Sequence, residues 1–464
     1  MTETIRRLGT RHSRLLMAGG IALMALLTSS VAFAQGRDKI IINGSACQVT
    51  EEDAVPDSYG GGFRQDLYLR VDFPDSDSHW RFGLRNDGLK GLSIVDVAIQ
   101  AAQFTSKQYM IKHAGLADIF VPYDDGTFDP YDMHYGYDNM DPIESADLPT
   151  YLSSLVYLRS LRPNNCLAKD FCFFRDSIPK VGVECRETGL AWLCKNHSDP
   201  SQNIRRRMHE VVVWGVYDGG NYDNIIEYRF REDGSVGFRY GATGYVNPGK
   251  TAAPHVHNGL WRVSTKLFDR TDNKALEFVH VNNPGGSSST DSELPITNET
   301  SLLWEPLKFS SVMVQSATNQ NKHGNPMGYE FIPWNRTGTG RFSQNPADKQ
   351  LWTLNDYYLT NDNPGEDGSG SGTNNWRYTW YAPDDYLLSY LNGQVIGATG
   401  DGIVVWYISS AHHEPTDSDS AEDTLDLDYA PYVGVTPIHW SGFDMDPHNL
   451  FDYNPLGGPP RCGN

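Results

Sequence analysis

Residues 224–244 read NIIEYRFREDGSVGFRYGATG, and their pattern sets the expected fold class. Apolar and aromatic residues alternate with polar ones on either side of Asp233-Gly234. Such alternation is typical of β-strands, because successive side chains point to opposite faces of a sheet. The Asp-Gly pair suits the positive φ angles of a tight hairpin turn. The stretch therefore predicts two antiparallel strands joined by a short turn.

The rest of the chain extends this pattern. It is rich in Gly, Tyr, Asn and Asp, has frequent turn signals, and shows few long stretches with the 3.6-residue period of a helix. Residues 402–410, GIVVWYISS, are typical of a strand buried on both faces. A chain of 464 residues exceeds the usual size of one domain. We therefore predict an all-β protein, either as two domains or as one large β architecture.

The first 34 residues have the features of a cleavable secretory signal. Four arginines precede an apolar run at 15–27, and small residues lead to Ala32-Phe33-Ala34. An uncleaved membrane anchor is the alternative, but no second apolar run of spanning length follows. We expect a secreted or periplasmic protein with no membrane attachment after cleavage.

The charge of the chain indicates which partners suit it, and its cysteine content indicates disulfide bonds. The formal net charge is −20, and removal of residues 1–34 makes the chain more acidic still. Such a surface repels nucleic acid and favours cationic small molecules. Six cysteines in an oxidising compartment suggest disulfide bonds, and no C-x-x-C pair suggests zinc or redox chemistry.

Two histidines flank one valine in TAAPHVHNGLW, residues 251–261. In a strand, His255 and His257 project from the same face, roughly 6.5 to 7 Å apart at their Cα atoms, and both can reach one metal ion. A third ligand is available from His412 or His413, just after the buried strand at 402–410. Three imidazoles without a thiolate suit Cu(II) or Zn(II), and the spacing alone does not choose between them.

A second motif favours Cu(II) over Zn(II). The stretch VVVWGVYDGGNYDNIIEY, residues 211–228, resembles the segment of the copper amine oxidases in which Asn-Tyr-Asp/Glu marks the tyrosine that becomes trihydroxyphenylalanine quinone. The H-x-H motif follows at the family's spacing. Further similar blocks are GLADIFVPYDDG at 115–126, NPMGYEFIP at 325–333 and SGFDMDPHNLFDYNP at 441–455.

The resemblance runs from about Trp80 to Pro455 and implies a domain organisation. The signal at 1–34 would be followed by a short segment, 35–79, and by a catalytic domain at 80–464. That domain is expected to be a large antiparallel β-sandwich with long loops. The resemblance also implies a homodimer.

The resemblance assigns roles to individual residues. Tyr222 would be the quinone precursor, with Asn221 beside it. His255, His257 and His413 would bind Cu(II), and His413 is preferred over His412 because the family's His-x-Pro matches residues 413–415.

Two further roles follow from the same resemblance. Tyr123 matches the tyrosine that hydrogen-bonds the quinone in relatives. Asp138, in GYDNMD, lies 84 residues before Tyr222 and best matches the catalytic base. Asp132 is the alternate, because the alignment of this segment is loose.

The implied reaction is oxidative deamination of a primary amine. The quinone accepts electrons from the amine, the aspartate takes the Cα proton, and dioxygen restores the quinone. The products are aldehyde, ammonia and hydrogen peroxide. The sequence does not choose between a small amine and a lysine side chain on a peptide.

Departures from the family pattern keep an alternative open. Asp218 replaces a threonine and Asn224 a tyrosine on either side of Tyr222. Ser264 and Lys266 replace two carboxylates of a peripheral calcium or manganese site, so we expect that second metal to be absent. The alternative is a secreted copper-binding relative that does not oxidise amines.

The resemblance also suggests a disulfide pattern. Cys185 occupies the place of one half of a family disulfide, which implies Cys166 or Cys172 as its partner. Cys47 would then pair with Cys462 and tie the two ends of the chain together.

Overall fold

The computed structural model describes most of the chain between residues 39 and 457. The described ranges are 39–52, 67–76, 78–86, 91–123, 128–131, 140–161, 173–175, 177–218, 222–244, 254–269, 271–281, 290–308, 310–334, 351–363, 386–397, 402–414 and 436–457. The predicted signal segment at 1–34 lies outside them. No helix in these ranges is long and apolar enough to cross a membrane.

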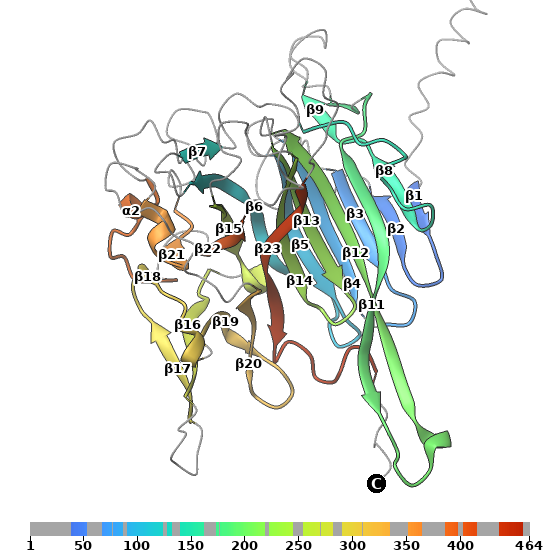
Figure 1. The fold of residues 1–464 in the computed structure, drawn as a ribbon. Coiled ribbons are helices and arrows are strands. Elements are labelled where there is room, and N and C mark those ends of the chain that lie inside the picture. The colour runs from blue at the N-terminus through green and yellow to red at the C-terminus, as the bar shows by residue number, and fades with distance from the viewer. Residues whose placement is uncertain are drawn as a thin grey trace, which may run out of the picture. The chain divides into compact units, whose positions relative to one another are not determined.

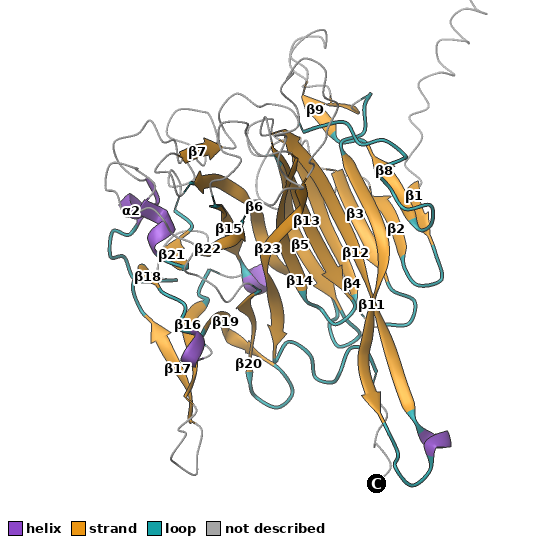
Figure 2. Ribbon diagram, viewed as in Figure 1, coloured by secondary structure: helices purple, strands orange, loops and turns teal. Residues whose placement is uncertain are grey.

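Strands make up nearly all the regular structure of the described residues, and the longest α-helical segment is the short α2 (Tyr386–Tyr390) (Figure 2). The first large sheet has the strand order β1 (Lys39–Asn43), β2 (Gln48–Glu52), β3 (Leu67–Asp72), β4 (His79–Asn86), β5 (Leu92–Gln100), β6 (Gln108–Pro122), β15 (His255–Thr265), β22 (Ile403–His413), β21 (Tyr357–Asn361) and β18 (Thr300–Leu302), with β7 (Phe128–Tyr131) paired to β6.

The second large sheet has the order β17 (Thr290–Ile296), β16 (Lys274–Val281), β19 (Ser311–Gln320), β20 (Pro326–Pro333), β23 (Thr436–His448), β14 (Val236–Gly244), β13 (Tyr222–Arg231), β12 (Ile204–Asp218), β11 (Val181–Cys194) and β8 (Ser153–Val156). A small separate pair joins β9 (Arg159–Leu161) and β10 (Phe173–Arg175). The pairings around the centres of both large sheets are antiparallel. In Figure 1, β11 and β12 extend together as a long hairpin beyond the body of their sheet.

The two large sheets pack face to face through one continuous core. Phe82 of the first sheet stacks on Phe230 of the second, with ring centroids 3.8 Å apart. Trp261 lies edge-on to Phe238 at 5.7 Å, and all four side chains are fully buried. Aromatic pairs of this kind add to the stabilisation from apolar burial. The predicted all-β antiparallel sandwich is confirmed.

The stretch that opened the sequence analysis forms β13 and β14, which pair from Tyr222 opposite Gly244 to Phe230 opposite Val236. The connection is longer than the predicted tight turn, since residues 232–235 separate the two strands, and among them only Gly234 has a positive φ, of 86°. Asp233 stabilises the turn instead by accepting a hydrogen bond of 2.9 Å from the backbone N–H of Ser235. Position 234 requires glycine, since an added Cβ would lie 2.6 Å from the ring of Phe451.

Strands from the segment before residue 80 belong to the same sheet as those after it. Residues 39–79 contribute β1, β2 and β3, and β3 pairs with β4 from Leu67 opposite Leu84 to Asp72 opposite His79. The segment predicted to precede the sandwich therefore supplies part of it.

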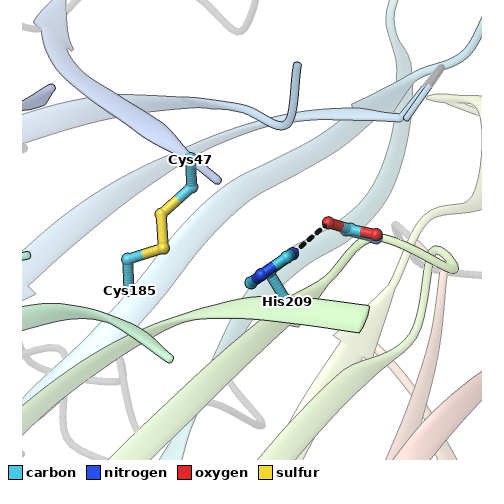
Figure 3. The surroundings of a disulfide bond; sticks show 4 residues. Cys47, Cys185 and His209 are labelled. Carbon is cyan, nitrogen blue, oxygen red and sulfur yellow. Dashed lines mark hydrogen bonds and ion pairs between the residues drawn. A yellow bond between two sulfur atoms is a disulfide. The ribbon is translucent and has the colours of Figure 1, made fainter. Parts of the chain in front are cut away.

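A disulfide joins the two sheets. Cys47, just before β2, is bonded to Cys185 on β11 (Figure 3). The predicted pairing of Cys185 with Cys166 or Cys172, and of Cys47 with Cys462, is therefore wrong. Sequence spacing could not reveal that β2 and β11 approach each other across the sandwich. This bridge closes a loop of 138 residues and so restricts the unfolded chain. It stabilises the fold by roughly a few kcal/mol, as other disulfides that close long loops do.

A buried ionic network holds one end of the first sheet. Asp362, which follows β21, accepts hydrogen bonds from Arg262 at 2.7 Å, Lys112 at 3.0 Å and Ser264 at 2.6 Å. Burial alone would raise the pKa of Asp362, but the two cations and the Ser264 hydroxyl outweigh it and lower the pKa to about 2. The carboxylate therefore stays charged inside the protein.

We predict that Asp362→Asn destabilises the protein by about 3 kcal/mol at pH 7, because it leaves Arg262 buried without its counter-charge. The folded-state pKa is depressed, so this contribution is complete above the unfolded pKa near 4 and is lost as the pH falls towards 2. Denaturant titrations at stepwise pH should show the two stability curves converging over that range. Asp75→Asn, at an exposed position, is the control, and equal stability of Asp362→Asn and the parent at pH 7 would contradict the prediction.

Candidate metal centre

Two adjacent strands of the first sheet bring three histidines together. β15 and β22 pair antiparallel, and His255 lies directly opposite His413. His257 lies two residues further along β15 and points to the same face, as the period of a strand requires. All three side chains are buried, and their candidate ligand nitrogens lie within 4.8 Å of one another. The structure therefore brings together the three histidines assigned as ligands in the sequence.

His412, the alternative third ligand, has a different environment. It lies opposite Val256 in the pairing of β15 with β22 and is exposed to solvent. Because neighbouring residues of a strand alternate in direction, His412 projects away from the face that carries His413. It is not a member of the buried cluster.

Tyr222 reaches the histidines from the opposite sheet. It is the first residue of β13 and is 1% exposed. Its hydroxyl lies 3.1 Å from Nε2 of His255 and 3.3 Å from Nδ1 of His413. Its ring lies edge-on to that of His257, with centroids 4.7 Å apart. The sandwich thus places one phenol directly beside all three imidazoles.

The geometry of the cluster fits a single transition-metal ion. Nε2 of His255 and Nδ1 of His413 are 3.1 Å apart. Two nitrogens that each bond one ion at about 2.0–2.1 Å can lie no more than about 4.2 Å from each other. The three histidine side chains would therefore need to move only slightly closer together for each to bond the same ion.

His257 gives a second reason to expect a metal. Among the residues that the structure describes, neither of its ring nitrogens has a hydrogen-bond partner, although the side chain is 1% exposed. Leaving a buried polar group unpaired costs free energy that a bound ion would recover. Burial first, and then three neighbouring histidines, hold the pKa of His257 well below its usual range. The imidazole is therefore neutral, which is the form that binds metals.

Two more rings complete the surroundings. Tyr123, assigned in the sequence as a partner of the quinone, forms a β-bridge with His255, and the two rings are 4.7 Å apart. His439 on β23 packs against His413, with ring centroids 4.2 Å apart. No spacing or motif in the sequence singles out His439, because it reaches the site only through the pairing of β23 with β14.

Carboxylates gather where β12 leads into β13. Asp218 lies opposite Asp223 in the pairing of these strands. Burial, followed by the charge of Asp218, raises the pKa of Asp223. Burial, followed by Asp218 and Asp223, likewise raises the pKa of Asp141. The aspartate that replaces the family's threonine thus adds negative charge beside the strand that carries Tyr222.

The remaining assigned residues, Asn221, Asp138 and Asp132, lie outside the described residues. Asn224, which replaces a family tyrosine, is fully buried and accepts a 2.9 Å hydrogen bond from the hydroxyl of Tyr240. It therefore has a packing partner of its own within the second sheet.

Comparison with known proteins indicates a family. Residues 246–461 match the family model described as copper amine oxidase, enzyme domain. A primary amine oxidase of Pisum sativum is 20% identical over 428 residues, which cover 82% of this chain and 58% of that protein. A primary amine oxidase of Klebsiella aerogenes is 22% identical over an alignment that covers 82% of this chain and 53% of that protein. The chain thus spans little more than half the length of these relatives.

Solved structures show the same fold. A copper-containing benzylamine oxidase from Hansenula polymorpha superposes with a TM-score of 0.62 at 15% identity, covering 83% of this chain and 60% of that one. A lysyl oxidase from Pichia pastoris gives a TM-score of 0.60 at 19% identity, with coverages of 82% and 53%. At these identities the likeness concerns the fold alone.

We predict that His413→Ala weakens Cu(II) binding by more than about a hundredfold, since loss of even an outer-shell partner costs roughly 10- to 100-fold. The neighbouring variant His412→Ala is a matched control that should bind Cu(II) as the parent does. Titration of metal-free protein with Cu(II) against a competing chelator measures both affinities. Equal losses in the two variants would contradict the assignment of His413.

Proposed function

The chain belongs to the copper amine oxidase family, and we propose that it is a copper- and quinone-dependent primary-amine oxidase. In this proposal it converts a primary amine, water and dioxygen to an aldehyde, ammonia and hydrogen peroxide. The observation that carries the proposal is the position of the Tyr222 hydroxyl, within 3.3 Å of ring nitrogens on both His255 and His413. A purely structural histidine cluster would not need a buried phenol at this point.

We assign the cofactors to residues of this chain. His255, His257 and His413 would hold Cu(II) through neutral imidazole nitrogens. Bound copper and dioxygen would supply the oxidising power that turns Tyr222 into trihydroxyphenylalanine quinone, which in turn would supply an electron sink for amine oxidation. Asn221 precedes the modified tyrosine and would help to position it.

Burial of the site serves this chemistry. Tyr222, Tyr123 and the three histidines are each at most 2% exposed. A dry site strengthens electrostatic interactions and limits side reactions with water. Tyr123, fixed by its bridge to His255, would hold the oxygen of the modified ring in a defined orientation.

Proton abstraction from the substrate needs a carboxylate base, and we propose Asp138, with Asp132 as the alternate. A base near the operating pH contributes roughly 10²- to 10⁴-fold to the rate. We predict that Asp138→Asn lowers kcat by that order while Asp132→Asn changes it by less than about tenfold. Steady-state assays of the two variants decide the assignment, and the reverse order of effects would move the role to Asp132.

The remaining parts of the proposal concern partners and location. The substrate would be a primary amine, either small or a lysine side chain on a peptide, and the negative net charge would favour its cationic form. We propose a secreted or periplasmic homodimer. Dimerisation is testable by sedimentation of the purified protein.

A second candidate is a copper-binding relative that does not oxidise amines. Two departures from the family pattern beside Tyr222 favour it. Asp218 adds negative charge, and Asn224 accepts a hydrogen bond from Tyr240. Such a protein would bind copper at the same three histidines and remain colourless in air, whereas the oxidase would develop a broad visible band that phenylhydrazine shifts.

We predict that Tyr222→Phe abolishes amine-dependent peroxide release, because it removes the hydroxyl on which quinone formation depends, while copper binding persists. Tyr329→Phe is the matched control, since that buried hydroxyl donates a 3.0 Å hydrogen bond to the Gly234 carbonyl instead. A coupled peroxidase assay with aryl, aliphatic and peptidyl amines measures the effect. Peroxide release from Tyr222→Phe at the parent rate would refute the proposed function.

A further inference from the structure

A pocket rich in cationic side chains lies on the first sheet. Its strands are not β15 and β22, which carry the three candidate copper ligands. It is a cavity of about 310 Å³, and its charged lining comes from β2, β3, β4 and the residue just before β6. The charged residues that line it are Glu52, Arg70, Arg81 and Lys107, with His79 beside them. The chain as a whole is strongly acidic, so this grouping does not follow from its composition.

Strand pairing places the two arginines directly opposite each other. Arg70 on β3 is the cross-strand partner of Arg81 on β4. Like charges at directly opposite positions destabilise a sheet. Lys107 adds a third positive charge to the same pocket. Three positively charged side chains therefore lie close together on this sheet, although their mutual repulsion is unfavourable.

Nearby carboxylates balance this charge only in part. Asp72 forms ion pairs with Arg70 at 2.9 Å and with His79 at 2.8 Å. Glu52 accepts a hydrogen bond from Nε of Arg81. Among the described residues no carboxylate forms an ion pair with Lys107. Three basic side chains thus face two acidic ones, and Glu52 itself forms one wall of the pocket.

Arg81 supplies a donor that the protein does not use. Its side chain is held by Glu52 and by the ring of Tyr68, whose centroid lies 4.3 Å from the guanidinium carbon. The residue is 7% exposed, and its Nη2 is buried without a hydrogen-bond partner among the described residues. A buried cationic donor left unpaired is costly, and an oxyanion is the acceptor that suits a guanidinium best.

We propose that this pocket binds a small oxyanion, of the phosphate or carboxylate class, between Arg81 and Lys107. The Arg81 guanidinium and the Lys107 ammonium, which both line the pocket, would donate hydrogen bonds to the anion. The anion would neutralise the excess positive charge and pair the unused donor. The electrostatics of Lys107 agree, since burial first and then Arg81 lower the pKa of its ammonium group, an effect that a bound anion would reverse.

Calorimetric titration of the full-length protein with inorganic phosphate at low ionic strength tests the proposal. We expect saturable binding that Lys107→Ala weakens by roughly tenfold, the usual size of a lost charge-assisted hydrogen bond. Lys107→Arg should retain most of the affinity. Lys195→Ala, which removes one positive charge at an exposed position outside the pocket, should leave binding unchanged.

Parallel titrations with succinate distinguish the source of the anion, because tighter binding of phosphate indicates a phosphate or phosphoester and tighter binding of succinate a carboxylate. Site-specific acylation of lysines locates the event, since the bound anion should protect Lys107 and not Lys195. Absence of saturable binding for both anions would overturn the proposal. Equal phosphate affinity in Lys107→Ala and the parent would also overturn it.

Discussion

The pairing of His255 with His413 across β15 and β22 is the contact on which the rest of the site depends. It fixes two imidazole nitrogens 3.1 Å apart in the buried face of a sheet, and strand periodicity then adds His257 on the same side. The opposite sheet contributes Tyr222 at the start of β13, so that packing of the two sheets, and no single loop, brings phenol and imidazoles together. Strands are rigid supports, which suits a site whose donors must hold a fixed geometry.

Local sequence patterns predicted the parts of the fold that depend on neighbouring residues. Alternation at 224–244, the apolar run at 402–410 and the H-x-H spacing each specify a strand and the side chains that share its face. The cluster of His255, His257 and His413 could be anticipated from these patterns together with the family resemblance. His413, the preferred third ligand, is buried in the structure and His412 is exposed, and the assignment of His413 to copper stays a prediction.

Contacts between residues that are far apart in the chain could not be predicted from the sequence. The disulfide between Cys47 and Cys185 requires knowing which strands face each other across the sandwich, and the spacing of cysteines does not contain that information. His439 reaches His413 only because β23 inserts between β20 and β14. Ser264, read in the sequence as a lost metal ligand, donates to Asp362, whose charge the chain balances with Arg262 and Lys112. Each of these contacts joins residues far apart in the chain.

The central proposal is that His255, His257 and His413 would hold Cu(II), at which dioxygen would oxidise Tyr222 beside them. Mass spectrometry of the peptide that contains Tyr222, before and after metal-free protein is exposed to Cu(II) in air, tests it most directly. The account predicts a residue that has gained two oxygen atoms and lost two hydrogen atoms, in the copper-treated sample only. An unmodified tyrosine in copper-saturated, air-exposed protein would contradict it.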